Sequence, residues 1–272
     1  MRNRHAAALL ACVLAASCCG GGPDGADLAM VPANSLCYIR ISSDAAGLVS
    51  ALMPEEASGV PVGLLEDLLD AGPLGAAVIS IDFTTLKPQL LFLSRGVDAG
   101  EMERIAGSRL DCRTEESRGR TDLLTERGGI LGSVASRDGW TCLYMGKAPT
   151  AVVGPWLEME ESGSLAADTG LTALEGGDAQ MSLLLPGNMI DFLGLLPLQR
   201  WYPGMAEMRT SFLSLRPRAL RVDLSTVPYI SLEARMVRQG GRHTRLSLEL
   251  EDPGLLADSL PAVVRAMAEE LL

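Results

Sequence analysis

The sequence predicts an α+β protein with two related halves, each an antiparallel sheet with helices packed on one face. Three observations predict this fold class. The apolar pattern switches repeatedly between a period of two and a period of 3.6 residues. Turn pairs such as Asp138-Gly139 join neighbouring strand-like segments, as antiparallel hairpins require. The order of strand, turn and apolar helix at 34–53 recurs at 178–197, although almost no residues are identical.

The elements of the first half follow one another closely. Residues 35–42 alternate as a strand, and Asp44 is placed to cap a helix that continues through Met53. An apolar helix is expected at 63–72, where Gly72 and Pro73 stop it. The further expected elements are strands at 76–83 and 89–96, a helix at 98–109 capped by Asp98, a polar hairpin at 111–126, a clearer hairpin at 129–146, a helix at 148–159 interrupted by Gly154-Pro155, and a loop at 161–170.

The second half is expected to repeat this plan. A hairpin at 219–236 parallels the one at 77–95, and "RQGGRH" at 238–243 turns the chain into a strand at 244–252. A closing helix at 252–272 corresponds to the one at 98–109. We therefore divide the domain into a first half at 31–163 and a second half at 164–272.

The N-terminal sequence has the pattern of an export signal. Arg2 and Arg4 precede an apolar segment at 6–16, and small residues follow it. The segment is shorter than the roughly 20 apolar residues that a membrane span needs. Its end, "LAASC", resembles the lipobox of bacterial lipoproteins, in which a cysteine is lipidated and becomes the new N-terminus. The resemblance implies that Cys18 carries the lipid.

Alternatives to Cys18 stay open. Cys12 follows a better-placed leucine but has a shorter apolar segment before it, and Cys19 would follow a cysteine instead of a small residue. A plain secretory signal with incidental cysteines is a further alternative. With Cys18, residues 1–17 form the signal peptide and residues 18–30 form the lipidated cysteine and a glycine-rich flexible tether. The protein would then be anchored in the bacterial cell envelope, facing the periplasm or the exterior, with the membrane as a partner through its lipid.

Composition narrows the function classes. The 272 residues carry a formal net charge of −11, which argues against nucleic acid as a partner. Lys87 and Lys147 are the only lysines, and all other basic residues apart from two histidines are arginines. We interpret that bias as genome composition.

Three cysteines lie in the body of the chain. Cys37 shares a strand face with Ile39 and Ile41, so a buried free thiol is expected there. Because exported proteins form disulfides, Cys112 and Cys142 are a possible pair.

Two segments resemble a family of uncharacterised bacterial envelope proteins. "VPANSLCYIRIS" at 31–42 is similar to their opening, a Pro-Ala-(Asp/Asn)-(Ser/Thr) turn that leads into a strand. "SLAADTGLTALEGGDAQMSLLLPG" at 164–187 resembles their middle segment. The resemblance implies a membrane- or lipid-anchored protein with two halves. The family has no established activity, so it implies no functional residues.

The sequence contains no recognisable catalytic motif. His243 is the only histidine after the signal peptide, it lies at an expected turn, and one histidine cannot supply a histidine-based metal site. Acidic clusters such as Glu115-Glu116 read as solvated surface. We expect no catalysis, no metal and no cofactor. An envelope hydrolase that uses carboxylates is the least favoured function class.

The apolar segment at 189–205 has two interpretations. It is either a core helix with a loop packed over it, or an exposed rim that binds a partner or a lipid. The residues of the possible rim are Phe192, Leu196, Trp201 and Tyr202. The sequence therefore favours an envelope protein that binds or scaffolds a protein partner. A periplasmic carrier of a lipid or other hydrophobic ligand is the alternative.

Overall fold

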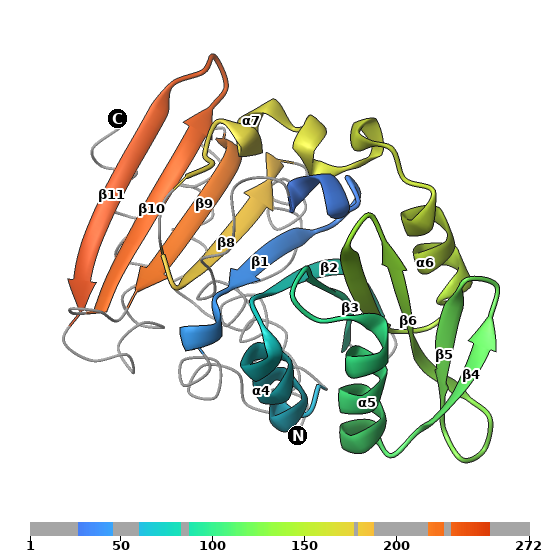
Figure 1. The fold of residues 1–272 in the computed structure, drawn as a ribbon. Helices are drawn as coiled ribbons and strands as arrows, with labels where there is room; N and C mark the ends of the chain where they lie inside the picture. Colours follow the sequence, from blue (N-terminus) through green and yellow to red (C-terminus); the bar gives the residue numbers. More distant parts are fainter. Residues whose placement is uncertain are drawn as a thin grey trace, which may run out of the picture.

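The computed structural model describes residues 27–45, 60–82, 87–176, 179–187, 217–225 and 230–250. The strands in these ranges are β1 (Cys37–Ile41), β2 (Leu74–Asp82), β3 (Lys87–Ser94), β4 (Arg113–Ser117), β5 (Arg120–Leu124), β6 (Ile130–Arg137), β7 (Trp140–Met145), β8 (Met181–Pro186), β9 (Pro217–Ser225), β10 (Ile230–Arg238) and β11 (His243–Leu250). They form one 11-stranded antiparallel sheet in the order β11-β10-β9-β8-β1-β2-β3-β7-β6-β5-β4 (Figure 1).

The continuous sheet corrects the predicted fold class. The prediction of two α+β halves, each with its own sheet, is wrong, because β1 pairs with β8 and places Ile39 opposite Leu183. Every residue of β1 is buried, so its backbone N–H and C=O groups need partners along both edges. Strand β2 supplies them on one side, and β8, about 140 residues later, supplies them on the other.

The predicted hairpins are confirmed. Strands β4 and β5 pair across Arg118-Gly119, and β6 and β7 pair across Asp138-Gly139. Both residues of each turn have positive φ, at 40° and 79° in the first turn and 52° and 77° in the second. A two-residue hairpin turn of this kind requires positive φ at both central residues. The residue types at the turn therefore indicated which strands pair.

Helices cover both faces of the sheet. They are α4 (Val62–Ala71), α5 (Ala99–Leu110), α6 (Thr150–Leu157) and α7 (Thr169–Thr172), with 3₁₀ turns η2 (Leu28–Met30), η3 (Ser43–Ala45), η4 (Glu161–Gly163) and η5 (Leu165–Ala167). The expected helices at 63–72 and 98–109 are confirmed as α4 and α5. Asp98 caps α5 by accepting a hydrogen bond from the Glu101 N–H at 2.9 Å.

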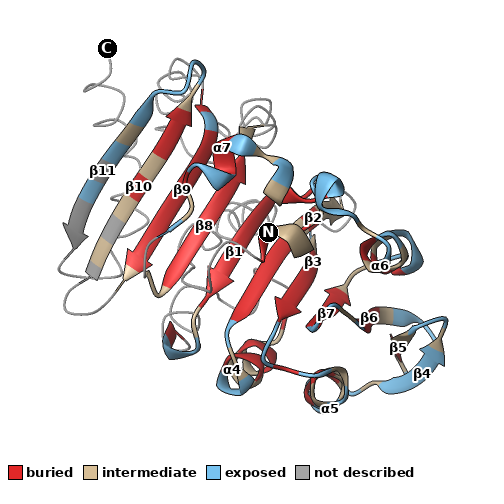
Figure 2. Cartoon of the chain, turned by 45° about the horizontal axis from the view of Figure 1, so that its top comes forward, coloured by how far each residue is buried: buried red, intermediate tan, exposed pale blue. Residues whose placement is uncertain are grey.

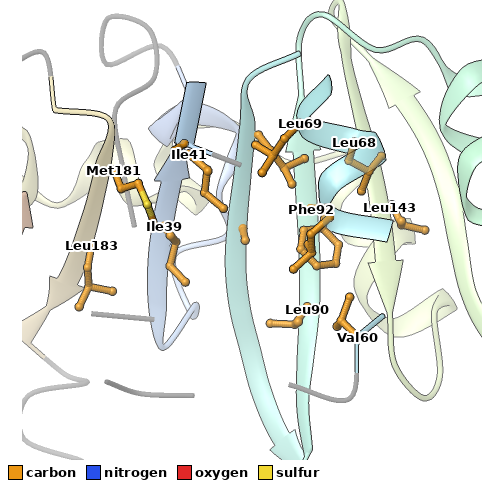
Figure 3. Close-up of a cluster of buried hydrophobic side chains, with 14 of the residues drawn as sticks. Ile39, Ile41, Val60, Leu68, Leu69, Leu90, Phe92, Leu143, Met181 and Leu183 are labelled. Carbon is orange, nitrogen blue, oxygen red and sulfur yellow. The ribbon is translucent and has the colours of Figure 1, made fainter. Parts of the chain in front are cut away.

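One face, which we call the α4 face, is covered by α4 and α5. Leucines of α4 and Met102 and Ile105 of α5 pack there on apolar side chains of the central strands. Figure 3 shows Leu68 and Leu69 of α4 lying over the strands beside Phe92. Central strands are buried, whereas β4 at one end of the sheet is largely exposed and His243, Arg245 and Ser247 of β11 at the other end are exposed (Figure 2).

The opposite face, which we call the α6 face, is covered by η2, α6, η5 and α7. Leu28, Trp156, Leu165 and Leu171 pack there on Tyr38 and other strand residues in a second apolar cluster. The expectation of helices on one face only is therefore wrong. The reason is that both faces of the central strands are apolar and must be removed from water.

Helix α6 continues through Gly154 and Pro155, so the predicted interruption is wrong. Val153 and Trp156 are buried against the sheet, and their packing outweighs the single hydrogen bond that Pro155 cannot donate. The loop expected at 161–170 contains η4, η5 and the start of α7.

The expected tether is too long by four residues. Asp27 to Met30 belong to the fold, and the Leu28 side chain is fully buried. The expected boundary at residues 163 and 164 also fails to separate two units. There the Leu165 N–H donates to Val31 O and the Ala33 N–H donates to Gly163 O, both at 2.8 Å, so the two segments pack together.

Helices expected at 44–53, within 188–197 and at 252–272 lie wholly or largely outside the described residues. Within the described part of the chain, no helix combines the length and apolar character that crossing a membrane requires.

Candidate binding site

A hollow of about 290 Å³ opens where β2, β3, β6 and β7 meet on the α4 face. Its apolar lining comes from the segment before α4 and from three strands: Val60, Pro88, Leu90, Ile130, Leu131 and Met145. Figure 3 shows Val60 beside Leu90. Leu90 and Met145 are paired across β3 and β7, so they present neighbouring side chains to the hollow.

Three charged side chains also line the hollow, Asp82, Lys87 and Lys147, beside Gln89 and Gly146. We call the hollow, defined by these three residues and the six apolar ones, the lysine pocket. Lys147 Nζ lies 2.7 Å from Asp82 Oδ2. The Lys87 side chain is exposed and makes no ion pair or hydrogen bond with any residue that the structure describes. The pocket therefore carries one positive charge that no described carboxylate neutralises.

Hydrogen bonds behind the pocket fix the backbone of Lys147. The Tyr144 hydroxyl lies 2.9 Å from Lys147 O and 2.5 Å from Gln89 Oε1. Gly146 leaves room for this hydroxyl, because a Cβ at Gly146 would lie 2.6 Å from it. Burial raises the pKa of Tyr144, so the hydroxyl stays protonated as a donor at neutral pH. The segment that carries Lys147 is thus held rigidly against β3.

Sequence reasoning missed this pocket, although a signal was present. Lys87 and Lys147 stand 60 positions apart and are the only lysines in the chain, yet both line the same hollow. Genome composition alone does not explain why both lie there. Their meeting depends on the antiparallel pairing of β3 with β7, which no local pattern specifies.

A buried ionic cluster lies on the α6 face, near the centre of the sheet. Arg40 contacts both oxygens of Asp27 at 2.6 and 2.7 Å and both oxygens of Glu175 at 2.7 and 2.8 Å. The Tyr38 hydroxyl donates to Asp27 at 2.8 Å. Burial by itself would lower the pKa of Arg40, but hydrogen bonds to Glu175 and the charge of Asp27 outweigh it and raise that pKa. Arg40 is therefore a permanently charged structural group.

Two further arginines hold the residues around Glu175. Arg221 donates to Leu174 O at 3.2 Å, and Arg235 donates to Gly176 O at 2.6 Å. Asp223 accepts from both arginines, at 2.7 and 2.6 Å. Strands β1, β9 and β10 thus each supply one arginine that donates hydrogen bonds to residues 174–176 after α7. Protein acceptors therefore already occupy each guanidinium. We assign this network to fold stability.

The three cysteines that the structure describes, Cys37, Cys112 and Cys142, are free. Cys37 is buried in the α4-face cluster with Ile39 and Ile41, as predicted. The possible Cys112–Cys142 disulfide is not formed, because Cys112 packs against the α4-face cluster while Cys142 belongs to the α6-face cluster. Burial raises the pKa of both Cys37 and Cys142 to about 12, so neither thiol supplies a nucleophilic thiolate at neutral pH.

The other residues singled out from the sequence fall into two groups. His243 is exposed at the first position of β11. Glu115 and Glu116 are both exposed on the edge strand β4. The proposed lipidation site and the possible apolar rim lie outside the described residues: Cys18, Phe192, Leu196, Trp201 and Tyr202.

Among the residues that the structure describes, no group of three or more His, Cys, Asp or Glu side chains is placed to hold a metal ion. Comparisons of the chain with models of protein families, with curated proteins and with solved structures gave no match in any of the three. The resemblance to envelope proteins therefore stays a prediction from the sequence.

Proposed function

We propose that this protein is a bacterial lipoprotein, anchored to the cell envelope through Cys18, whose domain binds or scaffolds a partner without catalysing a reaction. The observation that supports the anchor is the lipobox-like segment "LAASC" at 14–18, and the distance from that anchor to the domain is set by Asp27. This residue is buried and is joined to Tyr38 and Arg40 of β1. Nine residue steps separate it from Cys18, and they span at most about 32 Å. The lipid would therefore hold the domain close to the membrane surface.

The use of titratable groups supports binding over catalysis. Hydrogen bonds, mainly from arginine or hydroxyl groups, lower the pKa of four described carboxyls, those of Asp44, Asp67, Glu101 and Asp122. A general acid at neutral pH needs a raised carboxyl pKa instead. These groups act as ion-pair and hydrogen-bond partners in the fold.

One observation favours the second candidate, a carrier of a hydrophobic ligand. Six of the residues that line the lysine pocket are apolar. Its volume of about 290 Å³ is at the lower end for ligand pockets, which range from about 300 to 1,000 Å³. It suits a small ligand and is too small for a whole phospholipid. The possible apolar rim within 189–205, which would border such a ligand, lies outside the described residues.

Membrane fractionation tests the anchored state. We expect the full-length protein in the membrane fraction, resistant to high salt and released by detergent. Cys18→Ala should remove it from that fraction, whereas Cys19→Ala, the matched control one residue away, should leave it there. Cross-linking of the membrane-bound protein should then yield a discrete complex. Membrane association that survives Cys18→Ala would refute anchoring through this residue.

A further inference from the structure

The lysine pocket combines features that the rest of the described surface lacks. Of the side chains that the structure describes, Ile130 is the one large apolar side chain left exposed, with 46% of its surface accessible. Ile130 lies at the pocket, and both lysines of the chain line it as well. An exposed apolar side chain and two amines gathered at one hollow indicate a ligand with an apolar part and an anionic part.

The charge balance identifies the sign of the ligand. Lys147 is already engaged by Asp82, while Lys87 has no described partner. The three charged groups sum to one positive charge, on a chain whose formal net charge is −11. A monoanion would neutralise the pocket, whereas a cation would meet Lys87 without compensation. A dianion such as a phosphate ester would exceed the available charge.

The volume sets the length of the ligand. At about 290 Å³, the pocket lies just below the usual range of ligand pockets, about 300 to 1,000 Å³. That space accommodates a carboxylate with a medium-length alkyl chain. Pro88, Leu90, Met145 and Ile130 would receive the chain, and Lys87 at the exposed end of β3 would receive the carboxylate.

We propose that the lysine pocket binds a small amphipathic carboxylate, a medium-chain acyl anion, with its carboxylate on Lys87 and its alkyl chain over Leu90, Met145 and Ile130. This assignment rests on the proposed function, because it takes the domain to be a binding module, and it names the class of ligand. The Lys147–Asp82 ion pair borders the carboxylate site and positions the second amine. Binding is non-covalent and requires no co-reactant.

The presence of only two lysines permits a direct test. Reductive methylation with ¹³C-formaldehyde preserves the lysine charges and places an NMR reporter on Lys87 and Lys147. The mature full-length protein would be studied in lipid nanodiscs, with empty nanodiscs as the blank. Lys87→Arg and Lys147→Arg each remove one signal and so assign both. The probes are octanoate, butyrate and octyltrimethylammonium.

We expect octanoate to shift the Lys87 signal with saturation. Each buried methylene strengthens binding about fourfold, so butyrate should bind at least about tenfold more weakly. Octyltrimethylammonium should cause no saturable shift. In Lys87→Met, followed through the Lys147 signal, octanoate affinity should fall at least about tenfold. Arg104→Met, which removes an exposed positive charge outside the pocket, should leave it unchanged.

A second variant probes the apolar part. Ile130→Asn should weaken octanoate binding severalfold with little effect on folding, since this side chain is half exposed. Equal binding of octanoate and the octyl cation, full affinity in Lys87→Met, or the absence of a saturable octanoate shift would each overturn the proposal. None of these results bears on anchoring through Cys18, which membrane fractionation tests separately.

Discussion

Replacing Asp27 with Asn removes one charge from the buried cluster on the α6 face while keeping the size of the side chain. Asp27 is 1% exposed, and Arg40 is 3% exposed. The carboxylate accepts from Tyr38 and twice from Arg40. The substitution turns one carboxylate oxygen into an NH₂ group that faces the guanidinium, where it has no acceptor. Removal of one partner from a buried ion pair costs about 3–5 kcal/mol.

We expect about 3 kcal/mol, at the lower end of that range, because Arg40 keeps both contacts with Glu175. Glu175→Gln should cost less, about 1–2 kcal/mol, since its side chain is 21% exposed and water can solvate the site. Asp67→Asn is the control, because it breaks an exposed ion pair with Arg109 that is worth at most about 1 kcal/mol.

Urea unfolding of the purified mature protein, followed by the fluorescence of buried Trp140 and Trp156, measures these differences. The slope of unfolding free energy against urea should stay unchanged while the midpoint falls. Asp27 would not be the main stabilising partner of Arg40 if Asp27→Asn cost no more than Asp67→Asn, or if Glu175→Gln cost more than Asp27→Asn.

Two further predictions concern the thiols and acid stability. Under native conditions at pH 8, a thiol reagent should modify the partly buried Cys112 before the buried Cys37 and Cys142. Peptide mapping by mass spectrometry measures the order of modification, and early modification of Cys142 would contradict its burial. Burial opposes ionisation of Asp122, but hydrogen bonds from Arg120 and Ser133 outweigh it, so the pKa of Asp122 lies below its ordinary value. Its stabilising contribution is then complete above the unfolded-state pKa of about 3.9 and is lost as pH falls through the lower folded-state pKa. Asp122→Asn should therefore lower stability at pH 7 and flatten the decline below about pH 4, and an unchanged acid limb would contradict this.

Local signals in the sequence predicted the local parts of the fold. Helix α5 was expected from its apolar period and its Asp98 cap, and the β6–β7 hairpin was expected from Asp138-Gly139. In each case the decisive interaction joins residues within a few positions of one another. The capping hydrogen bond and the left-handed turn are encoded by single residue types.

The long-range arrangement could not be predicted in this way. The pairing of Ile39 with Leu183 merges the two expected halves into one sheet, yet both strands are apolar and would satisfy several alternative partners. Arg40, between Ile39 and Ile41, has the pattern of a solvated position in an alternating strand. It is buried because Asp27 and Glu175, distant in sequence, converge on it.

Anchoring of the binding domain to the envelope through Cys18 is the main proposal for this protein. Its most direct test is the intact mass of the protein extracted from membranes, combined with mass-spectrometric mapping of its N-terminal peptide. We expect a chain that begins at Cys18 and carries the added mass of several acyl chains on that residue. An unmodified Cys18, or a mature chain that begins elsewhere, would contradict it.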